Sequence, residues 1–350
     1  MHNPIQIGII GVGGIGAGAH MGGYQSVQGA KVVAICDVKP ARLKEIGDQF
    51  GIPEHLRFLD YHDLLACDEV DAVDICTPND SHCTIGLAAV EAGKPFNIEK
   101  PLGISIEETE ALLKAADEKH IKSQICFSYR FFPAVRYAKK LIDEGKIGRI
   151  HSIYANYLKD SAYWEGRRLD WRFDEKVARY GVSGDLAVHI LDTVRFLAGD
   201  YDGLIAQMDI IVKERKKLDS EDIVPVTTDD VCNFFARMKN GASATFGVSR
   251  AASGNKNRVR AEIYGEKGGF RFDLTDPKHM EIAMGGHAEM EEIEIPDKYR
   301  YPQQQSFVDL LYGKEDPWRP QLKDGVKLQY VLEALMESAQ KDQWVKIKES

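Results

Sequence analysis

The chain has 350 residues, 44% of them hydrophobic, so it is long enough to fill two ordinary cores. Its formal net charge is -9, and its 45 basic residues are interspersed with 54 acidic ones, which argues against a nucleic-acid partner. No apolar run approaches the roughly 20 residues of a membrane span, and the amino terminus lacks the pattern of a signal peptide. We therefore expect a cytoplasmic protein with no membrane partner.

The six cysteines and ten histidines predict neither disulfides nor a metal site. Cys36, Cys76 and Cys126 lie in apolar, strand-like runs, and the other cysteines lack C-x-x-C spacing. Reduced, mostly structural thiols are the expected state. The histidines are scattered without the clustered cysteine and acid ligands of a catalytic zinc, so we expect no metal.

The first motif follows the apolar run 5–10 directly and has the pattern G-x-G-x-x-G. In such a motif Gly11 permits a tight turn, Gly13 lets the backbone approach a pyrophosphate, and Gly16 lets the next helix pack close to its strand. That helix would point its amino terminus at the phosphates. A lone glycine motif would equally fit an ordinary turn. The residues predicted to contact a cofactor here are Gly11, Gly13, Gly14, Ile15 and Gly16.

Asp37 ends a second apolar run, 31–36, close to the spacing that dinucleotide sites show. Its carboxylate would accept hydrogen bonds from the adenosine ribose of NAD and repel the extra phosphate of NADP. Lys39 and Arg42 lie nearby in the sequence and would soften that repulsion. Strand, glycine loop, helix and acid in this order predict dinucleotide binding, with NAD favoured over NADP.

Strands and helices alternate through residues 1–127, which predicts a doubly wound, parallel Rossmann sheet of the α/β class. After a boundary near Ser128, residues 128–350 predict an α+β domain with a large, mainly antiparallel sheet. The expected strands are 5–10, 31–36, 57–59, 72–75, 95–98, 123–127, 149–157, 203–212, 231–238, 242–248 and 258–264. The expected helices are 40–50, 81–92, 105–119, 184–197, 303–312 and 325–340, with one more that starts at residue 133.

The most informative short stretch is Glu99-Lys100-Pro101, at the carboxyl end of the apolar run 95–98. Ligands of open parallel sheets bind at the carboxyl ends of the strands, so Lys100 would reach both nicotinamide and substrate. Pro101 biases Lys100 toward an extended conformation. The alternative is a surface lysine before a proline turn.

The loop after strand 72–75 is also polar. Thr77, Pro78 and Asn79 would line the cofactor beyond its pyrophosphate, and His82 opens the next helix. The alternative is a plain turn between strand and helix, which proline and asparagine also suit.

Asp185 and His189 are four residues apart near the start of a predicted helix and share one of its faces. The apolar positions of this helix form a separate stripe, which leaves the carboxylate and the imidazole free to line a cleft. Beside a lysine, these two groups would support proton transfer. In the alternative, Asp185 caps the helix and His189 is an interfacial histidine.

Taken together, the motifs resemble the glucose-fructose oxidoreductase and inositol dehydrogenase (Gfo/Idh/MocA) superfamily over nearly the full chain. The specific parts are the glutamate-lysine-proline stretch and the helix that carries Asp185, His189 and Asp192. The resemblance implies a catalytic triad of Lys100, Asp185 and His189, with Glu99 also at the cofactor. It further implies that the second domain has an open-faced sheet, binds the substrate, and forms homodimers or homotetramers through that sheet.

Three further stretches look like those of inositol and levoglucosan-type dehydrogenases. By similarity, Tyr129 and Arg130 would stand near the substrate, and Arg172 near the nicotinamide. Trp164 and Asn156 are additional pocket candidates, because an aromatic ring can stack on a sugar and an amide can bind its hydroxyls. Both could equally be structural. The stretches are 128–131, 171–172 and 249–257.

The implied activity is NAD-dependent oxidation of a secondary ring hydroxyl of a sugar or glycoside, with the 3-position suggested by levoglucosan dehydrogenases. His189 would remove the hydroxyl proton, Lys100 would stabilise the developing alkoxide, and Asp185 would orient the substrate. Three alternatives stay open: a myo- or scyllo-inositol dehydrogenase, a redox-assisted glycoside-cleaving enzyme with retained NAD, and a cofactor-binding regulator without turnover. The proton-transfer residues argue against the regulator.

Overall fold

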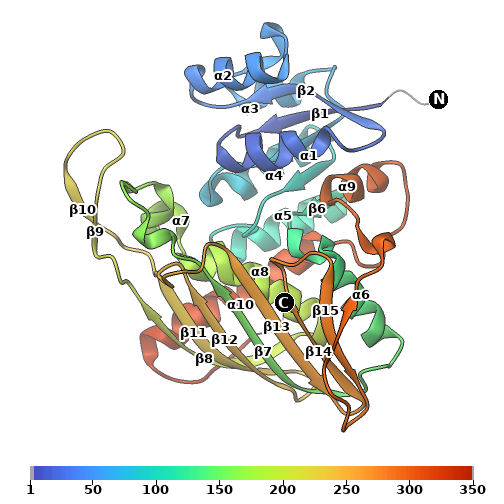
Figure 1. The fold of residues 1–350 in the computed structure, drawn as a ribbon. Helices are drawn as coiled ribbons and strands as arrows, with labels where there is room; N and C mark the ends of the chain where they lie inside the picture. The colour runs from blue at the N-terminus through green and yellow to red at the C-terminus, as the bar shows by residue number, and fades with distance from the viewer. Residues whose placement is uncertain (1–3, 349–350) are drawn as a thin grey trace. The chain divides into compact units, whose positions relative to one another are not determined.

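The computed structural model describes residues 4–348, which form two compact units (Figure 1). The first unit runs to Cys126 and also contains Pro302–Val326, while the second contains Phe127–Tyr301 and the chain from Lys327 onward. The structure thus groups 302–326 with the first unit, whereas the predicted domains divide the chain once, after residue 127. An amphipathic helix can bury its apolar stripe against either domain, and its sequence period does not say which.

The first unit is built on a six-stranded parallel sheet in the order β3-β2-β1-β4-β5-β6, which confirms the predicted Rossmann sheet. This is the strand order of dinucleotide-binding folds. The central strands are almost continuously apolar because helices cover both faces of a parallel sheet. The strands are β1 Ile5–Ile10, β2 Ala30–Cys36, β3 Arg57–Phe58, β4 Ala72–Ile75, β5 Phe96–Ile98 and β6 Ser123–Ile125.

Helices connect these strands. The helix after the glycine loop is a π-helical turn, η1, that continues into one short α-helical turn, α1. Ser105 caps α5 in a reciprocal capping box with Glu108, which explains why this helix begins where predicted. The helices are η1 Gly16–Met21, α1 Gly22–Tyr24, α2 Pro40–Phe50, α3 Tyr61–Ala66, η3 Asn79–Ser81, α4 His82–Glu91, α5 Ile106–Glu118 and α9 Gln303–Leu311.

The second unit contains a nine-stranded sheet in the order β16-β15-β14-β13-β7-β12-β11-β8-β17. Only the pair β7 and β12 is parallel among the described ladders of this sheet, so the predicted, mainly antiparallel sheet is confirmed. Its strands are β7 Ile150–Leu158, β8 Tyr201–Asp209, β11 Val231–Met238, β12 Ser243–Ser249, β13 Arg258–Gly265, β14 Gly268–Asp273, β15 His279–Met284, β16 Glu291–Glu294 and β17 Val345–Lys346. A separate hairpin pairs β9 Glu214–Lys216 with β10 Ile223–Pro225.

One face of this sheet is covered by helices, and Figure 1 shows α8 and α10 on that side. The other face carries a cross-strand row that includes the exposed side chains of Ile205, Phe235 and Tyr154. Ile205 lies opposite Phe235, Phe235 lies opposite Thr245, and Thr245 lies opposite Tyr154. Ile205, Phe235 and Tyr154 are 39%, 38% and 52% exposed. Assembly through this open face stays a prediction. The helices of the unit are η4 Ser128–Phe131, α6 Pro133–Asp143, η6 Trp171–Phe173, α7 Glu175–Ala178, η7 Ser183–Ala187, α8 Val188–Ala198 and α10 Leu322–Lys341, of which 327–341 belong here.

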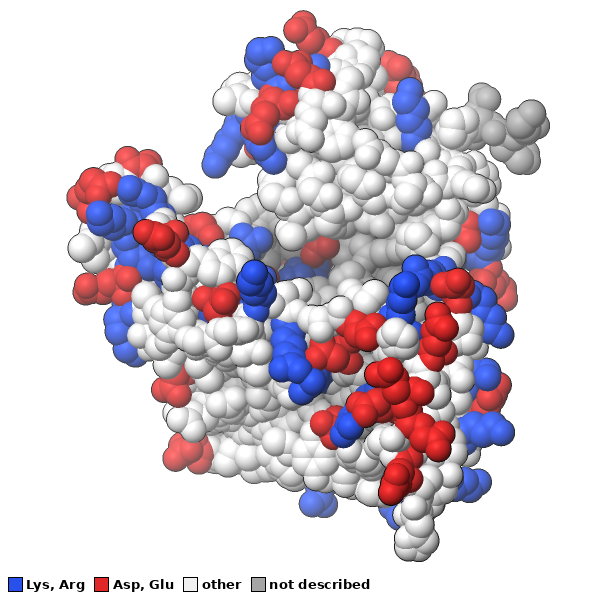
Figure 2. Space-filling model, viewed as in Figure 1, with Lys and Arg blue, Asp and Glu red and all other residues white. Residues whose placement is uncertain are grey.

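The surface agrees with the charge pattern of the sequence. Figure 2 shows basic and acidic side chains interspersed over the visible face of the molecule. Within residues 4–348, none of the helices combines the length and the apolar composition that crossing a membrane requires.

Candidate active site

The glycine loop after β1 is shaped for the backbone of a dinucleotide. Gly11 has a φ of +90°, and a Cβ atom there would lie 2.8 Å from the carbonyl group of Cys76. A Cβ on Gly16 would lie 2.0 Å from the carbonyl oxygen of Gly11. Beside Gly13, in contrast, a Cβ would meet nothing within 4 Å, so this side of the loop is open. The loop therefore fits a pyrophosphate that approaches bare backbone.

Asp37 stands at the end of β2 with its carboxylate tied to the glycine loop. The backbone N–H of Val12 donates to Oδ2 over 3.1 Å, and the N–H of Lys39 donates to Oδ1 over 3.0 Å. Arg42 donates from Nε to the carbonyl oxygen of Val12 over 2.7 Å and pairs with Glu45 at 2.9 Å. The acid is thus held beside the loop, where an adenosine ribose would meet it.

Two polar loops at the carboxyl edge of the first sheet are joined by His82. Its Nδ1 lies 2.8 Å from the carbonyl oxygen of Pro101, and its Nε2 lies 2.8 Å from that of Thr77. The ring is buried, which lowers the pKa of His82, although both carbonyl oxygens act in the opposite direction. His82 therefore braces the loop after β4 against the Lys100 loop, and its predicted contact with the cofactor stays a prediction.

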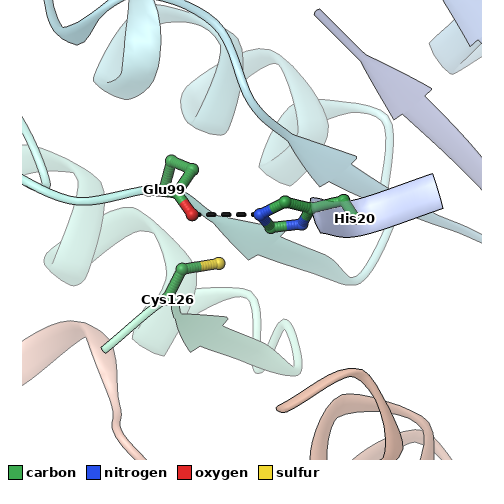
Figure 3. A group of neighbouring side chains, drawn as sticks. All are labelled: His20, Glu99 and Cys126. Carbon is green, nitrogen blue, oxygen red and sulfur yellow. Dashed lines mark hydrogen bonds and ion pairs between the residues drawn. The ribbon is translucent and has the colours of Figure 1, made fainter. Parts of the chain in front are cut away.

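The Lys100 loop leaves β5 with Glu99 turned toward the interior of the unit. The Lys100–Pro101 peptide bond is cis. The backbone N–H of Lys100 donates to Glu99 Oε2 over 3.1 Å, and Glu99 Oε1 lies 3.0 Å from His20 Nε2 (Figure 3). Both carboxylate oxygens of Glu99 thus contact protein groups, and the predicted contact of Glu99 with the cofactor stays a prediction.

In the second unit, His189 lies in an aromatic cluster. The ring of Tyr129 stacks on His189 with centroids 4.5 Å apart and planes 19° apart, and Tyr157 lies 6.4 Å from the same ring. Burial, followed by interaction with Tyr157 and Asp185, raises the pKa of Tyr129. Burial, with Asp185 acting in the same direction, raises the pKa of Tyr157 to about 12. Asp185 therefore lies close enough to act on both phenols, which stay protonated at neutral pH.

Arg130 forms a buried ion pair with Asp192. Its Nε and Nη2 atoms donate to the two carboxylate oxygens of Asp192 over 2.8 and 2.6 Å. The two side chains are only 4% and 1% exposed, and the guanidinium lies 4.9 Å from the ring of Phe196. This buried, bidentate pair fixes the segment that contains Tyr129 against α8. These contacts give Arg130 an anchoring role, and its predicted place near the substrate stays a prediction.

Trp164 and Arg172 each contact a residue close to them in the sequence. Trp164 is exposed and donates from Nε1 to Asp160 Oδ1 over 2.8 Å. The guanidinium of Arg172 lies 4.3 Å from the centroid of the Trp171 ring. The roles predicted for these two residues, at the sugar and at the nicotinamide, stay predictions.

Comparison with known proteins agrees with this geometry. Residues 5–127 match the family described as "Oxidoreductase family, NAD-binding Rossmann fold", and residues 135–271 match the "GFO/IDH/MocA C-terminal domain". Levoglucosan dehydrogenase of Pseudarthrobacter phenanthrenivorans is 30% identical, covering 89% of this chain and 88% of that protein. The chain belongs to the Gfo/Idh/MocA family of oxidoreductases. The predicted family, enzyme class and NAD cofactor are therefore confirmed.

One further relative and one solved structure show how far the likeness extends. Inositol 2-dehydrogenase of Rhizobium meliloti is 27% identical, covering 80% of this chain and 79% of that protein. A solved structure of levoglucosan dehydrogenase in complex with NADH and levoglucosan is 29% identical, with a TM-score of 0.89 over 99% of this chain and 100% of that chain.

Tyr157 was not among the residues predicted from the sequence, whereas its neighbour Asn156 was predicted to contact the substrate. Successive side chains of a strand point to opposite faces. In β7, Tyr157 is buried on the face toward α8, where its ring approaches His189, whereas Asn156 belongs to the opposite, open face. Asn156 therefore does not share the face of β7 that approaches His189, and its predicted contact with substrate stays a prediction. The alternation of apolar residues along the strand indicates that Tyr157 is buried, since Ile153 and Ala155 share the buried face with it.

In this NAD-binding family the fixed carboxylate of Asp37 should decide cofactor choice. We expect Asp37→Ala to weaken NAD binding by about ten- to a hundredfold, the value of a hydrogen bond to a charged group, while NADP binding improves as repulsion is lost. Fluorescence titration with NADH and NADPH measures both affinities without a substrate. Asp48→Ala removes the same charge from an exposed position in α2 and should change neither affinity. An unchanged preference in the Asp37 variant would refute this role.

Proposed function

We propose that this protein is an NAD-dependent dehydrogenase that oxidises a secondary ring hydroxyl of a sugar or its glycoside, with the 3-hydroxyl as the first candidate. The observation that carries the proposal is the stack of Tyr129 on His189, with Asp185 acting on the neighbouring phenol of Tyr157. An imidazole, a carboxylate and aromatic rings together suit a polyhydroxylated ring, which offers hydroxyls at its edge and C–H groups on its faces. The likeness to levoglucosan dehydrogenase supports the same substrate class.

The proposed chemistry divides between the two units of the chain. NAD, when bound, accepts the hydride from the carbon of the alcohol. His189 accepts the hydroxyl proton, and its stack on Tyr129 holds the imidazole in one orientation. Asp185 orients the substrate hydroxyl and tunes the imidazole. The ammonium of Lys100 stabilises the negative charge that develops on the oxygen.

Oxidation of a cyclitol is the second candidate, because inositol 2-dehydrogenase of Rhizobium meliloti is also a relative and an inositol ring presents the same kind of hydroxyls. We also retain the predicted cytoplasmic location, with which the six free cysteines of the chain agree.

The test is reduction of NAD, and separately of NADP, by the purified protein with inositols, free sugars, levoglucosan and other glycosides. Reduction of NAD with a sugar or glycoside would support the proposal, and product analysis by NMR would identify the oxidised carbon. Turnover confined to inositols would establish the cyclitol alternative. Silence across the panel, with NAD demonstrably bound, would refute a dehydrogenase on these substrates and favour the glycoside-cleaving enzyme or the regulator.

A further inference from the structure

A buried histidine with no role in the proposed chemistry joins two segments of the first unit. His20 lies in η1, the helix after the glycine loop, and is 2% exposed. Its Nδ1 lies 2.8 Å from Asp74 Oδ2, and its Nε2 lies 3.0 Å from Glu99 Oε1. Figure 3 shows the imidazole facing Glu99, with the thiol of Cys126 beside them. The ring thus bridges β4 and the residue that precedes Lys100.

Each carboxylate is also held through its second oxygen. Asp74 Oδ1 accepts a hydrogen bond from Asn97 Nδ2 over 2.9 Å, and Glu99 Oε2 accepts one from the Lys100 backbone N–H over 3.1 Å. An ionised carboxylate only accepts, and a neutral imidazole has a single N–H to donate. A neutral ring would therefore leave one of its two short contacts without a proton. An imidazolium supplies both protons and satisfies every group in the bridge.

The remaining titratable groups around the ring are neutral. Burial raises the pKa of the Cys76 thiol to about 12, and it raises the pKa values of Cys126 and Tyr24 well above their ordinary ranges. Burial by itself would lower the pKa of His20, but Asp74 acts in the opposite direction, and that pKa lies well above its ordinary value. The positive charge thus sits on His20, between the carboxyl groups of Asp74 and Glu99.

We propose that His20 is a positioning residue for the Lys100 loop, acting as an imidazolium that bridges Asp74 and Glu99. The imidazolium holds the Glu99 carboxylate, and Glu99 holds the backbone of Lys100. The placement of the lysine therefore depends on the helix that follows the glycine loop. This inference rests on the catalytic role proposed for Lys100, because a loop that positions no reacting group would need no such bridge.

A metal ion is the competing explanation for these side chains. Two sets of ligand types lie within 4.8 Å of one another: His20 with Asp74 and Cys76, and His20 with Glu99 and Cys126. A metal would require thiolates and an unprotonated ring nitrogen. The two short contacts between nitrogen and oxygen instead favour a shared pair of protons.

The protonation state is tested first, on the full-length protein labelled with 13C and 15N. At pH 8 the 15N spectrum should show His20 with both ring nitrogens protonated. A neutral His20 ring would overturn the proposal. Stoichiometric metal in the purified protein that is lost in Cys126→Ala would overturn it as well, in favour of an ion site.

The positioning role is tested next, in paired variants. His20→Gln should lower kcat by about ten- to a hundredfold, as expected for a reacting group misplaced by about 1 Å, with little change in KM. Cys126→Ala changes the same cluster without touching the bridge and should keep both kcat and the imidazolium signal. Full kcat in the His20 variant would contradict the proposal. If that variant does not fold, Glu99→Gln replaces it, and it should lower kcat.

The outcomes separate this inference from the proposed function. Should Lys100→Met retain turnover while His20 is an imidazolium, the catalytic role of the lysine fails and the bridge is only structural. Should His20 be neutral while Lys100→Met is inactive, the bridge fails and the proposed function stands.

Discussion

Replacing Lys100 by methionine is expected to lower kcat by about a hundredfold or more, the usual cost of removing one group that stabilises an oxyanion. Methionine keeps a long, unbranched stem of similar volume but has no ammonium group, so the developing alkoxide loses its positive partner. The affinity for NAD and the thermal unfolding midpoint should stay close to those of the parent protein. Single-turnover measurement of NADH formation, with the substrate found in the panel, isolates the chemical step.

Two further variants show whether charge, rather than bulk, is responsible. Lys100→Arg keeps a positive charge but presents a wider, planar group, so it should recover only part of the lost rate. Lys114→Met makes the same chemical change at an exposed position of α5 and should leave kcat unaltered. A Lys100→Met protein that folds and turns over at the parental rate would remove the centre of the proposed mechanism.

Truncating Asp192 to alanine is expected to reduce the free energy of unfolding of the second unit by about 3–5 kcal/mol, as for other buried pairs from which one partner is removed. The change deprives a guanidinium that is 4% exposed of its bidentate carboxylate, and water cannot replace it at that depth. Because Arg130 follows Tyr129 directly, the aromatic cluster at His189 should loosen too. Urea unfolding followed by circular dichroism and tryptophan fluorescence measures the loss.

The matched comparison is the double variant Arg130→Met with Asp192→Leu. It removes both charges and fills similar volume, so it should lie close to the parent in stability. Lys44→Ala breaks an exposed pair with Asp48 and should cost less than about 1 kcal/mol. A loss of that small size in Asp192→Ala would show that the buried pair does not anchor the segment.

Features that depend on neighbours in the chain could be predicted from the sequence. The strand 5–10, the glycine spacing and Asp37 follow from the apolar period and local turn chemistry, so the Rossmann unit and its binding of NAD could be predicted. The place of Lys100 after β5 followed in the same way, because a proline and a short apolar run mark the end of a strand.

Features that depend on residues far apart in the chain were settled by tertiary structure alone. Arg130 meets Asp192 across 62 positions, and His20 meets Glu99 across 79, so neither pair leaves a periodic trace in the sequence. The return of 302–326 to the first unit is of the same kind. Local sequence by itself determined which segments form strands or helices and which polar residues follow the strands. Only the packing of distant segments decided which buried charged side chains pair with one another. A buried charge without a partner is costly, and the sequence does not show which distant residue will lie next to it.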